Sequence, residues 1–163
     1  MIELILVRHA KSDWGDAGVA DHDRPLNERG RHDAPLMAER LARSGAEVER
    51  IVSSTAVRAR TTAAAFGAEL ELEVELDPEL YAAPASTLLA KAAGTNAASA
   101  MVVAHNPGIS DLAAQLSGDG IAHMPTCAVA RFAWAAESWS ELGSRVSARW
   151  WFDSPRGTAH EME

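Results

Sequence analysis

Two histidines and several arginines lie at or shortly after the ends of apolar runs of this sequence, at three separate places. The run IELILV ends in Arg8 and His9, the run AMVVA ends in His105, and the segment SSTAVRAR carries Arg58 and Arg60. A neutral imidazole is a nucleophile, and a guanidinium group binds oxyanions through its fixed fork of N–H donors. This set of residue types is therefore suited to chemistry on an anionic group, provided that the fold brings the three places together.

The elements that carry these residues alternate along the chain. Short runs rich in Val and Ile alternate with segments of helical period, which is typical of an α/β protein. Strands are expected at 2–8, 50–53, 72–76, 100–105, 127–134 and 145–152, and helices at 27–43, 55–68, 85–93 and 108–116. The last two strands have no helix between them, so they are expected to form an antiparallel hairpin with a longer loop.

The position of the basic residues at strand ends predicts where they meet. In open α/β sheets the ligand crevice lies beyond the carboxyl ends of the strands. We therefore expect the two histidines and at least one arginine to line a single pocket for an anion at that edge.

Each motif also has a purely structural interpretation. The segment HNPG, which begins at His105, contains Asn, Pro and Gly, which all favour turns. Arg58 and Arg60 could lie on a solvated helix face, although cations at a helix N-terminus oppose the macrodipole and favour an anionic partner. They lie roughly 200 degrees apart around a helix, so only one of them should line the pocket. Periodicity does not choose between the two.

Length, charge and cysteine content narrow the class of protein. At 163 residues the chain fits one globular domain, expected at 1–153, with 154–163 as a mobile C-terminal tail. It has 15 Lys and Arg against 23 Asp and Glu, a formal charge of -8, which disfavours nucleic acid and anionic lipid as partners. Since no apolar run reaches the length of a membrane span and no signal peptide is evident, a cytoplasmic location is expected. The single cysteine, Cys127, is assigned to packing.

Three ordered segments resemble the histidine phosphatase superfamily. LVRHAKSDW resembles its Arg-His-Gly signature, SSTAVRARTTAAAF resembles its Ser-x-x-x-Arg-Ala-x-x-Thr helix start, and VVAHNPG is similar to its second-histidine segment. DHDRPLNERG and LDPELYAA resemble, more narrowly, the SixA-like phosphohistidine phosphatases. The resemblance implies a phosphoglycerate mutase-like fold, a three-layer α/β sandwich whose central mixed, mostly parallel sheet is flanked by helices.

The resemblance also implies a role for each catalytic residue. His9 is implied as the nucleophile that becomes transiently phosphorylated, with Arg8, Arg58 and His105 binding the phosphoryl group, and it is the resemblance that selects Arg58 over Arg60. Phosphoryl transfer requires an in-line nucleophile and positive charge around the equatorial oxygens, with little further covalent work. Neither a metal nor a cofactor is therefore expected.

Four further residues are candidates at the edge of the pocket. Asn106 is expected to contact substrate, and Lys11 is a candidate contact at the rim of the pocket, although a solvated side chain is the favoured interpretation of Lys11. Glu79 stands where larger members of the family keep a general acid for an alcohol leaving group, with a solvent-facing loop residue as the alternative. Trp14 follows the first motif and could form a wall of the site.

The segment ADHDRPLNERGRHDA contains two histidines among aspartates, which raises the question of a metal site. His22 and His32 are ten residues apart with Pro, Asn and Gly between them, a spacing that matches no familiar metal site. Asp21 and Arg24 are instead expected to order the loop at the edge of the pocket, and Asn27 to cap the helix that follows.

The sequence departs from the family pattern at four positions. Ala10 replaces the usual glycine after the histidine, Gly15 stands where mutase-like members often carry asparagine, and Thr55 and Thr61 replace the common proline and glutamine of the arginine motif. These differences argue against a mutase or sugar-phosphate role more than against phosphate binding.

The function expected from these motifs is a phosphatase with a phosphohistidine enzyme intermediate, acting on phosphohistidine in proteins. The chain has little length left for a segment over the site, and an open pocket admits a protein side chain. Two alternatives remain: a phosphatase for small phosphate esters with the same site, and a non-catalytic module that binds phosphate or phosphoprotein. The presence of both His9 and His105 argues against the second alternative, and the effect of Glu79→Gln separates the first from the main hypothesis.

Overall fold

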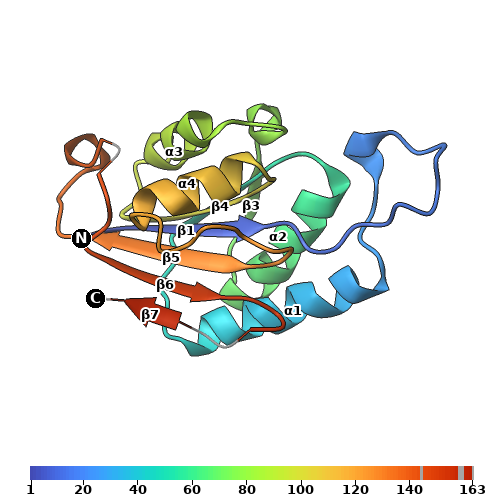
Figure 1. The fold of residues 1–163 in the computed structure, drawn as a ribbon, viewed down its shortest axis with the longest axis horizontal. Helices are drawn as coiled ribbons and strands as arrows, with labels where there is room; N and C mark the ends of the chain where they lie inside the picture. Colours follow the sequence, from blue (N-terminus) through green and yellow to red (C-terminus); the bar gives the residue numbers. More distant parts are fainter. Residues whose placement is uncertain (144, 158–159, 163) are drawn as a thin grey trace.

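A single mixed sheet organises the computed structural model, which describes residues 1–143, 145–157 and 160–162. The order of its strands is β3-β2-β4-β1-β5-β6-β7 (Figure 1). The strands are β1 (Ile2–Arg8), β2 (Arg50–Ser53), β3 (Val74–Leu76), β4 (Ser99–Ala104), β5 (Val129–Trp134), β6 (Arg149–Asp153) and β7 (His160–Met162).

The sheet has a parallel half and an antiparallel half, which meet at β1. β1 pairs in parallel with β4, and β4 and β3 pair in parallel with β2. On its other side β1 pairs antiparallel with β5, and β5, β6 and β7 continue as an antiparallel meander. The hairpin predicted for the last two strands of the sequence analysis is thereby confirmed as β5 and β6.

Helices cover both faces of the sheet, which confirms the predicted three-layer α/β sandwich (Figure 1). The helices are α1 (Glu28–Arg43), α2 (Val57–Leu70), α3 (Ala85–Gly94) and α4 (Gly108–Leu116). Side chains alternate between the two faces along β1, as the pleat of a strand requires. Ile5 and Val7 pack in the core with α1 and α2, whereas Leu4 and Leu6 pack in the core with α3 and α4.

The parallel register fixes where the motifs of the sequence meet. Arg8 is opposite Ala104, and Ser53 is opposite Val103, so β1, β2 and β4 end at nearly the same level. The residues that directly follow them, His9, Ser54 and His105, therefore lie at the same edge of the sheet.

Two glycines allow helices to approach this edge closely. A Cβ atom on Gly30 of α1 would lie 2.1 Å from the carbonyl oxygen of Lys11, and one on Gly108 of α4 would lie 2.0 Å from the carbonyl oxygen of Ala83. Any side chain at either position would collide with backbone. The helices are thus held directly against the segment that follows β1 and the segment that precedes α3.

The ends of several elements differ from the predicted ones for identifiable reasons. β3 begins at Val74 instead of 72, because the N–H of Leu72 donates to the carbonyl of Gly67 and closes α2. β6 begins at Arg149 instead of 145, because the N–H of Ser147 donates to Leu116 at the end of α4. Asn27 caps α1 as predicted, since its side chain accepts the N–H of Gly30 at 2.9 Å.

The C-terminal segment contributes a strand that the sequence analysis does not predict. Residues 160–162 pair antiparallel with β6 and form β7 at one edge of the sheet. The pattern of charges and turn residues in this segment gives no strand signal.

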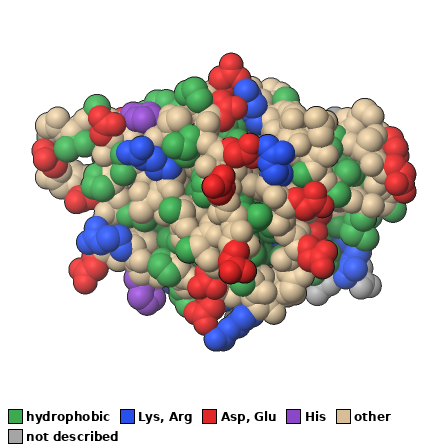
Figure 2. All heavy atoms as spheres, turned by 180° about the vertical axis from the view of Figure 1, so that it is seen from behind, with side chains coloured by type: hydrophobic (Ala, Val, Ile, Leu, Met, Phe, Trp, Pro, Cys, Tyr) green, Lys and Arg blue, Asp and Glu red, His purple; other side chains and the backbone are tan. Residues whose placement is uncertain are grey.

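The surface is acidic, as the composition predicts. Figure 2 shows Asp and Glu side chains spread over the face seen from behind, in keeping with the formal charge of -8. Among the described residues, no helix is both long and apolar enough to cross a membrane.

Candidate active site

The structure brings the four predicted catalytic residues together at the carboxyl ends of β1 and β4. The ring centroids of His9 and His105 lie 5.1 Å apart, with their planes tilted by 52°. Both rings are buried, as is Arg58 in the first turn of α2, and Arg8 is partly buried. Arg60 is exposed, so only one of the two arginines of the helix lines the pocket.

His9 is held as a neutral imidazole with one ring nitrogen available. Its Nδ1 lies 2.8 Å from the carbonyl oxygen of Ala10, which can only accept, so Nδ1 carries the proton. Burial, together with the neighbouring His105, Arg58 and Arg8, lowers the pKa of His9 to about 3, against the opposing effect of the Ala10 carbonyl. The lone pair therefore lies on Nε2, which is the atom of a nucleophile.

The residue after His9 is anchored to the arginine helix. The N–H of Ala10 donates to Thr62 Oγ1 at 2.9 Å, and Thr62 Oγ1 in turn donates to the carbonyl of Arg58 at 2.7 Å. The segment that carries the nucleophile and the helix that carries the anion-binding guanidinium are thus joined through one hydroxyl group.

His105 is fixed by a serine and flanked by a tyrosine. Its Nε2 hydrogen bonds to Ser54 Oγ at 2.7 Å, and the ring of Tyr81 lies edge-on at a centroid distance of 5.5 Å. Burial, followed by the charge of Arg58, lowers the pKa of His105 to about 4. Within the described part of the chain, its Nδ1 is buried without a hydrogen-bond partner.

Both arginines are bound through their terminal nitrogens and keep Nε unpaired. Arg8 donates from Nη1 to the carbonyl of Met124 at 3.1 Å, and Arg58 donates from Nη1 and Nη2 to Asp21. The Nε atoms of both are buried and have no partner among the described residues. An unpaired buried donor is costly unless a ligand satisfies it, so the pocket presents two guanidinium edges suited to an oxyanion.

The predicted ordering of the loop by Asp21 and Arg24 is confirmed. Arg24, which is buried, donates from Nη1 to Ser12 Oγ at 2.7 Å and from Nε to Asp21 Oδ1 at 3.2 Å. Trp14 is 70% exposed and stacks on the guanidinium of Arg24, with Cζ 3.4 Å from the ring centroid. The contacts of Trp14 among the described residues are therefore with this loop and not with the histidines.

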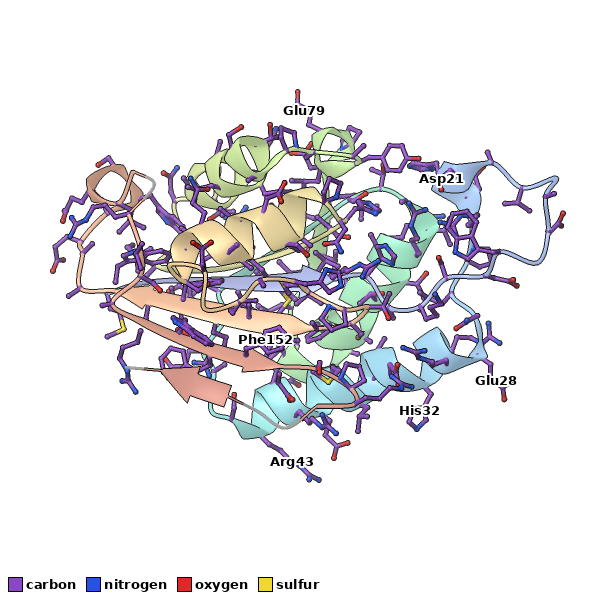
Figure 3. The ribbon with its side chains drawn as sticks, viewed as in Figure 1. Asp21, Glu28, His32, Arg43, Glu79 and Phe152 are labelled. Atoms are coloured by element: carbon purple, nitrogen blue, oxygen red, sulfur yellow. The ribbon has the colours of Figure 1, made fainter. Side chains whose placement is uncertain are left out.

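Three candidate substrate contacts are placed less directly, and their roles stay predictions. The Asn106 side chain binds Ser110 Oγ and the Met124 carbonyl. Lys11 accepts the Asn27 N–H through its backbone carbonyl, and no interaction of its side chain is found in the described residues. Glu79 is ion-paired with Lys91, its side chain is 68% exposed, and it points away from the sheet (Figure 3).

Sequence reasoning assigned no place in the pocket to four residues that complete the site. Ser54 and Thr62 stand four residues before and after Arg58 within the motif that identifies it, so the position of Ser54 at a strand end and the helical period for Thr62 were available signals. Tyr81 and His22 had no periodic signal, although both lie in the two segments that resemble SixA-like phosphatases. His22 Nε2 lies 2.8 Å from Thr55 Oγ1, and its ring lies edge-on to Tyr81 at 5.0 Å.

The surroundings of Cys127 and His32 give neither residue a role in the pocket. Cys127 is buried, and burial raises the pKa of its thiol to about 12, in agreement with a packing role. Among the described residues, no group of three or more His, Cys, Asp or Glu side chains is arranged to hold a metal ion. His32 is exposed on α1 and points away from the sheet (Figure 3).

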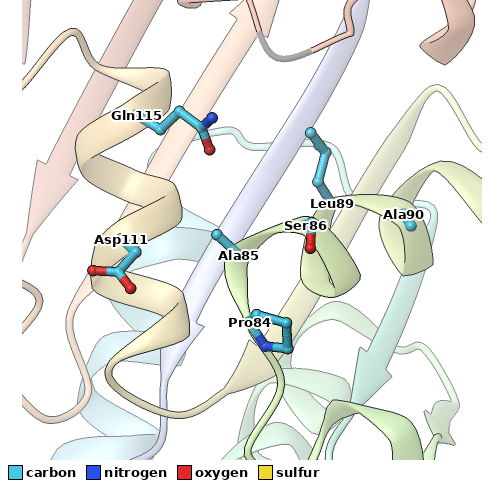
Figure 4. Close-up of a pocket in the computed structure, with 7 residues that line it drawn as sticks. All are labelled: Pro84, Ala85, Ser86, Leu89, Ala90, Asp111 and Gln115. Atoms are coloured by element: carbon cyan, nitrogen blue, oxygen red, sulfur yellow. The ribbon is translucent and has the colours of Figure 1, made fainter.

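A separate hollow of about 580 Å³ lies between α3 and α4. Figure 4 shows its lining, which is largely apolar around Leu89, with Asp111 and Gln115 on the α4 side. None of the histidines or arginines of the pocket lines it, so it is distinct from the candidate active site.

Comparison with known proteins gives consistent matches. Residues 4–82 match the family model of the histidine phosphatase superfamily (branch 1). An uncharacterised protein of Mycobacterium tuberculosis is 34% identical over 162 residues, covering 92% of this chain and 100% of the relative. The solved structure of SixA from Agrobacterium tumefaciens is similar with a TM-score of 0.76 and 31% identity, covering 82% of this chain and 92% of that one. The protein histidine phosphatase SixA complexed with tungstate matches with a TM-score of 0.78 and 26% identity, covering 94% and 97%.

Proposed function

Because the chain belongs to the histidine phosphatase superfamily, we propose that it is a phosphatase that passes the phosphoryl group through His9 to water, with phosphohistidine in proteins as its substrate. The observation that carries this proposal is the pairing of a neutral His9, whose Nε2 has no hydrogen-bond partner among the described residues, with two buried arginine Nε donors of the same pocket.

The first step of the proposed reaction uses His9 Nε2. Its lone pair attacks phosphorus and forms a new P–N bond, and His9 becomes a phosphoimidazolium that keeps its Nδ1 proton. The P–N bond of the substrate breaks, and the substrate's imidazole, which carries a proton on its other ring nitrogen, takes the electron pair and leaves as neutral imidazole. Arg8 and Arg58 stabilise the charge on the equatorial oxygens through their unpaired edges, which is where the transition state needs it. In the second step water attacks phosphorus, His9 is released as neutral imidazole, and inorganic phosphate leaves.

The surroundings of the site support a phosphohistidine substrate over an alkyl phosphate ester. An alcohol leaving group needs a proton from a general acid. Glu79 is engaged with Lys91, and Asp21 is ionised, since hydrogen bonds from Tyr81 and Arg58 lower its pKa to about 2. An imidazole leaving group depends much less on such an acid. The similarity to SixA structures supports the same substrate class.

The test is to trap the intermediate and compare substrates. Wild type, His9→Ala and His32→Ala are each given a phosphohistidine peptide and p-nitrophenyl phosphate, and phosphate release and acid-labile phosphate on the enzyme are measured. His32 is a matched control because it is an exposed histidine outside the pocket. We expect turnover and labelling in wild type and His32→Ala, and neither in His9→Ala.

Two results would contradict the proposal in different ways. Equal turnover by His9→Ala and wild type would remove the mechanism. Turnover of p-nitrophenyl phosphate with none of the phosphohistidine peptide would retain the mechanism and indicate a small ester as the substrate.

A further inference from the structure

One residue, Asp21, binds the terminal nitrogens of Arg58. Arg58 Nη1 donates to the backbone carbonyl of Asp21 at 2.6 Å, and Nη2 donates to its carboxylate Oδ2 at 3.0 Å. These two nitrogens form the end edge of the guanidinium, whereas Nε and the second hydrogen of Nη2 form its side edge. Because Nε is buried without a partner among the described residues, Asp21 occupies one edge and leaves the other for an anion.

The segment that carries Asp21 is not held by apolar packing. The 3-10 turn Asp21–Asp23 contains no buried residue, and Ala20 before it provides no side-chain cap. Its position therefore depends on polar contacts, including that of Asp21 Oδ1 with Arg24 Nε at 3.2 Å. Figure 3 shows Asp21 on this turn, and the hydrogen bonds from Arg58 to Asp21 join the turn to α2.

The same carboxylate also holds the tyrosine that flanks His105. Tyr81 donates its hydroxyl hydrogen to Asp21 Oδ2 at 2.5 Å, and its ring lies 5.5 Å from that of His105. Asp21 thus joins the arginine of α2 to the wall of the pocket beside the second histidine.

From these contacts we propose that Asp21 is a positioning residue, which turns the side edge of Arg58 toward the phosphoryl group and holds Tyr81 against His105. The inference deepens the proposed function and rests on it. Asp21 itself does not touch the reacting atoms. Its effect arises because a guanidinium with one edge fixed loses few rotamers when an oxyanion binds to the other edge, whereas a free arginine side chain must be ordered at that moment.

The test is a double-mutant cycle on the binding of tungstate, an oxyanion that requires no turnover. Dissociation constants are measured by calorimetry for wild type, Asp21→Ala, Arg58→Ala and the double variant. We expect Asp21→Ala to weaken binding about tenfold and Arg58→Ala about a hundredfold. Since Asp21 acts through Arg58, the double variant should bind no more weakly than Arg58→Ala.

The inference would be contradicted if the effects of the two substitutions on the dissociation constant multiply in the double variant. If the double variant binds about a thousandfold more weakly than wild type, Asp21 acts independently of Arg58. If Asp21→Ala binds tungstate as tightly as wild type, or more tightly because a negative charge has been removed, Asp21 does not position the arginine.

Asp23→Asn provides the matched control within the same turn. Asp23 is an exposed carboxylate that contacts His22 at 3.2 Å, and no contact with Arg58 is found in the described residues. We expect its tungstate affinity to stay within about twofold of wild type. A loss equal to that of Asp21→Ala would assign the effect to the turn as a whole and overturn the specific role of Asp21.

A conservative variant separates positioning from folding. Asp21→Asn keeps an oxygen that can accept from Arg58, so it should retain more affinity than Asp21→Ala, and it replaces Asp21→Ala in the cycle if the latter does not fold. Thermal unfolding without tungstate checks the fold of each variant. Wild type that binds no tungstate would refute the anion pocket of the proposed function, whereas tight binding with an additive cycle would refute only the role of Asp21.

Discussion

Arginines in the two halves of the sheet have opposite surroundings. At the carboxyl ends of the parallel half, Arg8 and Arg58 each keep a buried Nε without a partner among the described residues. In the antiparallel half, Arg131 of β5 donates from Nε and Nη2 to Glu3 Oε1 at 3.1 and 2.7 Å, and its Cζ lies 4.8 Å from the centroid of the Trp151 ring. An arginine side chain thus stabilises the fold where its guanidinium donors are paired within the protein. It is available to a ligand where Nε has no partner.

The contrast extends to the other buried polar groups. In the part of the chain that the structure describes, the buried side-chain nitrogen and oxygen atoms without a partner belong to Arg8, Arg58, His105 and Ser99. Three of these four residues are in the candidate active site. Because an unpaired buried polar group costs stability, its concentration at one edge of the sheet indicates that this edge is built for binding.

The largest expected effect is the loss of activity when Arg58, whose Nε has no partner among the described residues, is replaced. Arg58→Ala should lower kcat/KM roughly a thousandfold, since it removes charge stabilisation that the transition state needs. Arg58→Lys should recover little, because an ammonium group cannot present a planar fork. Steady-state kinetics with a phosphohistidine peptide measure both. The control is Arg60→Ala, an exposed arginine of the same helix, and a comparable loss there would show that general helix charge is responsible.

Substitution of Arg131, whose guanidinium group already binds Glu3, should affect stability and not activity. Arg131→Ala should lower the free energy of unfolding by about 3 kcal/mol, because it leaves the mostly buried Glu3 carboxylate without its cation. Chemical denaturation measures this change, and activity per folded molecule should stay within about twofold. Loss of activity with unchanged stability would erase the distinction between the two halves.

The buried histidines should make stability depend on pH. The pKa of His9 is lowered to about 3 and that of His105 to about 4, whereas both titrate near 6.5 in the unfolded chain. Between pH 6.5 and about 4, the unfolded chain therefore binds more protons than the folded protein, so stability falls as the pH falls. From pH 7 to pH 5, wild type should lose about 2 kcal/mol more than His9→Ala in denaturation experiments. Equal losses would mean that His9 is protonated in the folded protein near its ordinary pKa.

The smallest effect is expected at Glu79, which is exposed and ion-paired with Lys91. Glu79→Gln should change turnover of a phosphohistidine peptide by less than about twofold, because its ion pair with Lys91 is exposed and the imidazole leaving group needs little acid. The same kinetics with an alkyl phosphate ester show whether the effect of Glu79→Gln depends on the leaving group. A large loss on both substrates would place Glu79 in the reaction after all.

The centre of the site was predictable from the sequence because strand ends carry it. Arg8, His9 and His105 directly follow hydrophobic runs, and parallel strands bring their carboxyl ends to one edge. The choice of Arg58 over Arg60 required the family resemblance, since the two lie on opposite sides of the first turn of α2 and periodicity does not decide which side faces the pocket.

The wall of the site could not be predicted in the same way. Tyr81 reaches His105 from the connection between β3 and α3, and its place depends on tertiary contacts that no local pattern encodes. β7 was missed for a similar reason: a three-residue edge strand gains its stability from pairing with β6 and has no periodicity of its own.

The central claim is that His9 and two guanidinium edges surround one oxyanion, and a crystal structure with tungstate tests it most directly. The account predicts tungstate against His9 Nε2, with the Nε–H groups of Arg8 and Arg58 donating to its oxygens. Tungstate bound elsewhere, such as the hollow between α3 and α4, with both Nε donors left unpaired, would contradict it.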